Sequence, residues 1–174
     1  MNGQPHKYDP IAISSESTVV AEYVPDLRAD APYQSEAQLE AELIELLQGQ
    51  AYEYLQIQTE ADLTANLRKQ LERLNDMCFT DAEWERFFEG SIASANEGIV
   101  EKTVRMQEDH VQVLRRDDGT SKNIQLIDKR SIHNNHVQVI NQYEVAPSED
   151  GVRYGNRYDV TILVNGLPMV HVEL

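Results

Sequence analysis

The sequence is most strongly constrained by an Asn-Gly pair, Asn165 and Gly166, which separates two runs rich in β-branched and apolar residues. Such a pair is a strong short-range indication of a β-hairpin, because both residues readily adopt the positive φ angles of a tight turn. We therefore predict an antiparallel hairpin within residues 156–174.

Two acids lie within this predicted hairpin, one near each end. Asp159 lies near the start of the first strand and Glu173 near the end of the second. A hairpin brings its second strand back alongside the first, so both carboxylates reach the same end of the sheet. Mg²⁺ prefers carboxylate and carbonyl oxygens as ligands. We therefore predict a metal site at Asp159 and Glu173.

The register of the hairpin decides whether the two acids can meet. With a two-residue turn and regular pairing, Asp159 lies opposite Val172, and Glu173 falls on the other face of the sheet. A three-residue turn, or a β-bulge beside Pro168, would instead place Asp159 opposite Glu173. A shared metal site therefore requires one of these two irregularities.

The hairpin also carries a family resemblance. The stretch 156–174 resembles the nuclease motif near the start of the motor and restriction subunit of type I restriction-modification enzymes, a PD-(D/E)xK nuclease. Three shorter stretches extend the resemblance to nearly the whole chain: Tyr33-Gln34-Ser35-Glu36, Gly98-Ile99-Val100-Glu101-Lys102-Thr103 and Asn141-Gln142-Tyr143-Glu144. The fold implied is a restriction-endonuclease-like mixed sheet flanked by helices.

The resemblance implies a role for individual residues. Asp159 and Glu173 would bind Mg²⁺ together with the Leu174 carbonyl, while Tyr158 stands where the broader motif has its proline. The motif lysine is expected immediately after Leu174, where this sequence stops. We therefore expect no DNA cleavage by the 174-residue chain alone, even with Mg²⁺.

In this family an acid on the first helix assists the metal site, which makes Glu36 and Glu40 candidates. A solvated position at the boundary of the core remains the alternative for either residue.

The function implied is endonucleolytic cleavage of double-stranded DNA within an ATP-driven complex. The expected partners are double-stranded DNA and the modification and specificity subunits. ATP is expected to bind only to motor domains that this sequence lacks.

Length and composition predict one domain without a membrane segment. The 174 residues suffice for one sizeable core. We expect an irregular N-terminal arm over residues 1–32 and the nuclease-like domain over residues 33–174. Cys78 is the single cysteine, so an intrachain disulfide is excluded, and a cytoplasmic location is expected.

The charge is unusual for a protein that binds DNA. The chain carries 30 acids and 15 bases, a net charge of −15. Residues 1–100 hold 19 of the acids and only 6 of the bases. Tight phosphate binding depends on Lys and Arg, so other parts of a larger complex would have to deliver the DNA. The alternative is a non-catalytic acidic module that docks on partner subunits or mimics DNA.

Periodicity and capping residues predict three helices in the first half. Ser35 would cap a helix over residues 34–48 whose apolar stripe includes Leu39, Leu43, Leu46 and Leu47, and a short strand is expected over residues 51–57. Thr59 and Thr80 would cap the next two helices. The aromatic residues of the third helix, Trp84, Phe87 and Phe88, are assigned to the core.

The second half alternates with a period of two and predicts strands. Residues 110–114 and 123–127 form a hairpin around Asp117-Asp118-Gly119, and residues 136–145 form a further strand. The fold class is therefore α/β or α+β, with helices packed on a mixed sheet. Six basic residues could form a cationic rim for DNA or be scattered surface charges: Arg105, Arg115, Arg116, Lys122, Lys129 and Arg130. Lys129 is also a weak candidate to replace the motif lysine.

Overall fold

The structure is a computed structural model, and it describes residues 8–13, 19–23, 34–94, 97–145 and 156–174. Contacts divide the chain into two units, residues 1–34 and 35–174. In the first unit, β1 (Tyr8–Ile13) and β2 (Val19–Tyr23) form an antiparallel hairpin. The stretch predicted to be an irregular arm therefore contains regular backbone pairing.

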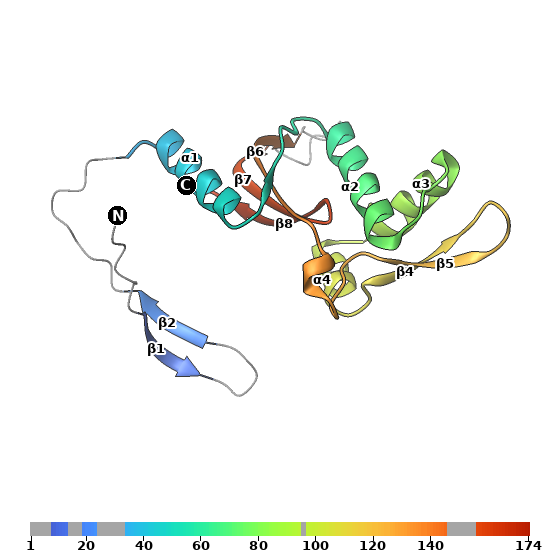
Figure 1. Ribbon diagram of the computed structural model, residues 1–174, viewed down its shortest axis with the longest axis horizontal. Helices are drawn as coiled ribbons and strands as arrows, with labels where there is room; N and C mark the ends of the chain where they lie inside the picture. The colour runs from blue at the N-terminus through green and yellow to red at the C-terminus, as the bar shows by residue number, and fades with distance from the viewer. Residues whose placement is uncertain (1–7, 14–18, 24–33, 95–96, 146–155) are drawn as a thin grey trace. The chain divides into compact units, whose positions relative to one another are not determined.

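The second unit combines helices with a mixed sheet, which confirms the predicted α/β class (Figure 1). Its helices are α1 (Glu36–Gly49), α2 (Glu60–Asn75), α3 (Asp81–Phe87) and α4 (Ile99–Gln107), with a π-helical turn at Phe88–Ile92 and a 3₁₀ turn at Ile132–Asn134. Its strands are β3 (Glu53–Tyr54), β4 (Val111–Arg115), β5 (Ser121–Gln125), β6 (Val137–Val145), β7 (Asn156–Val164) and β8 (Leu167–Val172).

The central sheet has the strand order β3-β6-β7-β8. Strand β3 runs parallel to β6, whereas β6, β7 and β8 are successively antiparallel. Six of the described side chains in the two middle strands are fully buried: Gln138, Val139, Ile140, Val160, Thr161 and Leu163. The middle of the sheet is therefore buried on both faces, and it includes the polar side chains of Gln138 and Thr161.

The β4–β5 hairpin forms a separate two-stranded sheet rather than part of the central one. Its inward residues Leu114 and Ile124 join Trp84 and Phe87 in one hydrophobic cluster. The predicted hairpin is thus confirmed, and the aromatic residues of α3 belong to the core as expected. The hairpin covers the helices instead of extending the sheet.

The three predicted helix starts are confirmed by side-chain caps. The hydroxyls of Ser35, Thr59 and Thr80 each accept a hydrogen bond from a backbone amide three residues later. In α1, however, no residue is fully buried, and Leu46 is 60% exposed, so the predicted apolar stripe is only partly covered.

One predicted strand is too long, and one helix was not predicted. The strand expected over residues 51–57 is reduced to the two residues of β3. Helix α4 was not predicted; its apolar residues Ile99, Val100 and Val104 are exposed, while Met106 packs against the core. Its start is stabilised by the Glu101 carboxylate, which accepts a hydrogen bond from the Gly98 amide. The loop predicted over residues 147–155 lies outside the described residues.

Candidate functional site

The turn between β7 and β8 has two residues, Asn165 and Gly166, both with positive φ (51° and 80°). The Asn165 side chain is buried, donates to the Leu126 carbonyl (3.0 Å) and accepts from the His136 amide (2.8 Å). A Cβ on Gly166 would lie 2.6 Å from the Leu67 Cα in α2. The turn is therefore held by backbone conformation and by close packing together.

A β-bulge follows the turn. Leu163 pairs with Pro168, but Ile162 pairs with Val170, so Met169 is an extra residue on β8. Proline has no amide hydrogen to donate, which favours an irregular ladder beside it. The bulge beside Pro168 is one of the two irregularities that a shared metal site requires.

The bulge changes the register at the far end of the hairpin. Val160 pairs with Val172, and continuing this register places position 159 opposite position 173. The Leu174 amide donates a 2.9 Å hydrogen bond to Asp159 Oδ2. The backbone beside Glu173 thus lies within hydrogen-bonding distance of the Asp159 carboxylate, and both acids are at the same end of the sheet.

The available ligands are oxygen atoms. Asp159 and Glu173 offer carboxylates and Leu174 offers a backbone carbonyl, a donor set of the type that Mg²⁺ prefers. Within the described ranges, no three His, Cys, Asp or Glu side chains come together as metal ligands. A divalent ion here would therefore depend on two carboxylates, a carbonyl and solvent.

The structure distinguishes the two acids of the first helix. Glu36 is the first residue of α1 and is exposed, as expected for a solvated position. Glu40, one turn later, is half-buried and accepts hydrogen bonds from Asn141 Nδ2 and Gln142 Nε2 on β6. Glu40 is therefore the first-helix acid that contacts the sheet.

His171 lies on β8, two residues before Glu173. Its Nδ1 is 2.9 Å from the Thr161 hydroxyl, and its ring stacks on Tyr158 with centroids 3.9 Å apart. Partial burial lowers the pKa of His171, and the nearby Glu173 carboxylate opposes this effect. The lowered pKa favours the uncharged imidazole.

Three of the six cations considered for a DNA rim already have partners. Arg105 pairs with Glu97, and Arg116 Nε lies 2.8 Å from the buried Glu83 carboxylate. The Lys129 ammonium donates to the Gln107 carbonyl at the end of α4. These cations stabilise loops and helix ends, and Lys129 is not directed to the acids of the hairpin.

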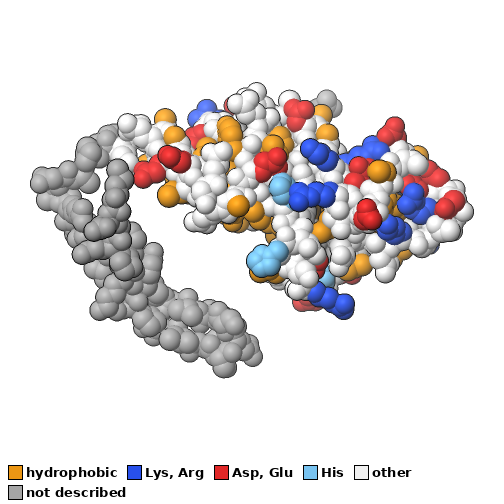
Figure 2. Space-filling view, viewed as in Figure 1, with side chains coloured by type: hydrophobic (Ala, Val, Ile, Leu, Met, Phe, Trp, Pro, Cys, Tyr) orange, Lys and Arg blue, Asp and Glu red, His pale blue; other side chains and the backbone are white. Residues whose placement is uncertain are grey.

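The charges on the surface are unevenly distributed. On the face shown in Figure 2, basic side chains gather over α2, α3 and the β4–β5 hairpin, with acids among them, while α1 shows mainly acids. The sequence of α1 contains four Glu and no Lys or Arg. An acidic α1 is the feature that the alternative docking function would use.

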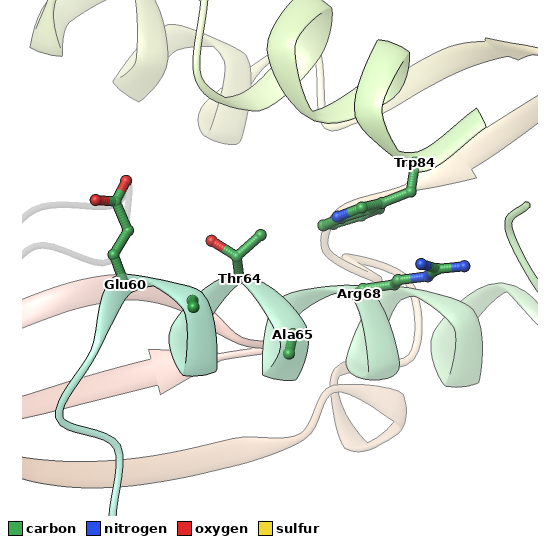
Figure 3. A pocket seen from close by; sticks show the side chains of 6 residues that line it. Glu60, Thr64, Ala65, Arg68 and Trp84 are labelled. Carbon is green, nitrogen blue, oxygen red and sulfur yellow. The ribbon is translucent and has the colours of Figure 1, made fainter. Parts of the chain in front are cut away.

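A shallow groove lies elsewhere, between α2 and α3 (Figure 3). It is lined by Glu60, Ala61, Thr64, Ala65, Arg68 and Trp84. The Arg68 guanidinium is already bound to the Asp81 carboxylate (2.8 Å) and the Phe79 carbonyl (2.6 Å). The groove contains none of the predicted site residues.

None of the helices among the described residues is long and apolar enough to cross a bilayer.

Comparisons with known proteins connect the chain to one family. The family described as type I restriction enzyme R protein N terminus matches residues 33–174. The type I restriction enzyme EcoprrI endonuclease subunit of Escherichia coli is 45% identical over 166 residues, which cover 95% of this chain and 51% of that protein.

Two staphylococcal relatives are more distant. The type I restriction enzyme SsaAORF53P endonuclease subunit of Staphylococcus saprophyticus is 35% identical, and the SauMSSORF170P endonuclease subunit of Staphylococcus aureus is 34% identical. Each match covers 82% of this chain and 15% of the relative. The chain thus spans about half of the Escherichia coli relative and a small part of the staphylococcal ones.

Proposed function

Because this chain belongs to the family of the type I restriction enzyme R protein N terminus, we propose that it forms the nuclease part of such a subunit. The reaction would be metal-dependent hydrolysis of double-stranded DNA. The main support is the bulged register, in which Val160 pairs with Val172, because continuing this register would place position 159 opposite position 173.

Asp159, Glu173 and the Leu174 carbonyl would hold Mg²⁺ in this proposal. Their oxygen donors fit a hard divalent ion, which when bound would polarise the scissile phosphate and lower the pKa of a water molecule. The hydrogen bond from the Leu174 amide orients the Asp159 carboxylate.

In this proposal, DNA delivery and ATP use depend on other parts of the complex. The net charge of −15 disfavours tight DNA binding by these residues alone. We therefore propose that DNA is delivered by the remainder of the subunit and by the modification and specificity subunits. ATP would act in the motor domains, outside these 174 residues.

A metal titration of the purified chain tests the proposal. We expect saturable binding of Mn²⁺ or Mg²⁺ to the wild type and its loss in Asp159→Asn and Asp159→Ala. Asparagine keeps an oxygen that can accept from the Leu174 amide, so Asp159→Asn removes the charge with little effect on the hairpin. Glu45→Gln, which alters an exposed acid of α1, should bind metal like the wild type.

A second function is favoured by the acidic surface of α1. Four Glu without a basic residue on this helix suit a module that docks on a basic surface of a partner subunit, or that mimics DNA. The same titration separates the two functions. Identical flat curves for the wild type and both Asp159 variants would contradict the nuclease and favour the docking module.

A further inference from the structure

We propose that Asn141 and Gln142 are positioning residues, which hold the Glu40 carboxylate beside Asp159 so that it supports metal binding. This inference rests on the proposed nuclease function and names residues that tune the same site. Glu40 would act through the solvent around the ion rather than as a direct ligand, since no three acidic or His side chains converge among the described residues.

The contacts of Glu40 fix its carboxylate from two sides. One oxygen accepts from Asn141 Nδ2, and the other accepts from Gln142 Nε2. The Tyr54 hydroxyl donates a 2.8 Å hydrogen bond to Asn141 Oδ1, which orients the Asn141 amide with its nitrogen toward Glu40. Two amide donors on one carboxylate form charge-assisted hydrogen bonds, which are stronger than neutral ones.

The register places this pair beside Asp159. Asn141 pairs with Val160 and Tyr143 pairs with Tyr158, so Gln142 lies at the level of Asp159 on the adjacent strand. Helix α1 also packs against β7, the strand that carries Asp159. Glu40 therefore reaches the sheet one strand away from the predicted metal-binding acid.

The backbone at Gln142 is strained. Its φ is 53°, a left-handed conformation that is unfavourable for a residue with a side chain. The side chains also stop alternating here, because Ile140 and Tyr143, three residues apart, share one hydrophobic cluster with Leu163. Glycine would adopt this conformation more easily, but it could not donate to Glu40. Strain of this kind persists where the surrounding structure or function requires it.

Gln142→Gly separates a positioning role from a structural one. The substitution relieves the strained backbone but also removes the amide that donates to Glu40, so the two effects oppose each other and the midpoint of thermal unfolding should change little. Mn²⁺ affinity should nevertheless fall, by about 10-fold or less, because Gln142 orients Glu40 and not a direct ligand of the ion. Asn141→Ala is a second variant, for which we expect a similar loss of affinity.

A double substitution tests whether the effect passes through Glu40. If Gln142 acts by holding Glu40, Glu40→Gln should weaken Mn²⁺ binding, and Glu40→Gln combined with Gln142→Gly should bind no more weakly than Glu40→Gln alone. Additive losses would overturn the proposed route through Glu40.

Two results would overturn the inference in different ways. Loss of binding in Asp159→Asn with unchanged affinity in Gln142→Gly and Asn141→Ala would overturn the positioning role alone. Unchanged binding in Asp159→Asn would overturn the proposed function and the positioning role with it.

Discussion

Gly166 shows how a single residue controls the hairpin that carries both acids. Its φ of 80° is unfavourable for any residue with a Cβ, and α2 packs directly against it. The neighbouring Asn165 is buried and bonded to the loop before β6. The turn therefore joins the sheet to α2 and to that loop.

Gly166→Ala should destabilise the protein by about 2 kcal/mol or more, because the strained φ adds to a clash with the Leu67 backbone. Chemical denaturation monitored by the Trp84 fluorescence would measure this loss. Gly119→Ala is the matched control, since Gly119 also has a positive φ (84°) but has open space around its Cα. Equal losses for the two variants would show that packing against α2 contributes nothing.

At the scale of elements, a buried carboxylate connects α3 to the β4–β5 hairpin. Glu83 is 1% exposed and accepts hydrogen bonds from Arg116 Nε (2.8 Å) and the Asp117 amide (3.0 Å). Its other oxygen accepts from the Thr80 amide (3.1 Å) and completes the helix cap. The Glu83 carboxylate thus accepts hydrogen bonds from backbone amides at the start of α3 and in the β4–β5 turn.

The Glu83 interactions predict a pH dependence of stability. Hydrogen bonds from the Asp117 and Thr80 amides lower the pKa of Glu83 from its ordinary value of 4.5. The unfolded chain therefore binds more protons between the folded and ordinary pKa values, so the stabilisation is complete above pH 4.5 and is lost as the pH falls through the folded pKa.

Glu83→Gln should lower the unfolding midpoint at pH 7, because an amide NH₂ would face the groups that donate to the carboxylate. It should also lose less stability than the wild type when the pH is lowered below 4.5. Thermal unfolding across the pH range provides the measurement. Glu85→Gln, an exposed acid on the same helix, is the control and should follow the wild type. Parallel pH profiles for Glu83→Gln and the wild type would contradict the assignment.

At the scale of the whole molecule, charge limits what the chain can do alone. The chain has a net charge of −15. Some of its basic residues, such as Arg105 and Arg116, form internal ion pairs. Phosphate binding draws its affinity from Lys and Arg that are free to displace counterions. The described surface therefore lacks the strong positive field of an independent DNA-binding domain.

The isolated chain should accordingly bind double-stranded DNA only weakly at about 0.15 M salt, where screening shortens electrostatic interactions to about 8 Å. Fluorescence anisotropy of a labelled duplex at several salt concentrations would measure this. Saturable submicromolar binding at physiological salt would contradict the proposed delivery of DNA by other parts of the complex.

Local patterns in the sequence were sufficient for most of the elements and for the Asn-Gly turn, but not for α4 or for the β1–β2 hairpin. Helix caps such as Ser35 and Thr80 act within three residues, and alternation identifies β6 and β7 without knowledge of distant contacts. The resemblance correctly indicated the family. Helix α4 was missed although its apolar residues recur at helical spacing, because strand-like alternation was expected throughout the second half of the chain.

Only the tertiary structure decided how the candidate site is arranged. The bulge at Met169 moves the hairpin register by one residue, and the sequence could state it only as one of two alternatives. The contact of Glu40 with Asn141 and Gln142 spans about a hundred residues of chain, beyond any local pattern. Local hydrogen bonds and steric preferences determine the elements, whereas register and the packing of α1 on the sheet depend on how all the elements are buried together.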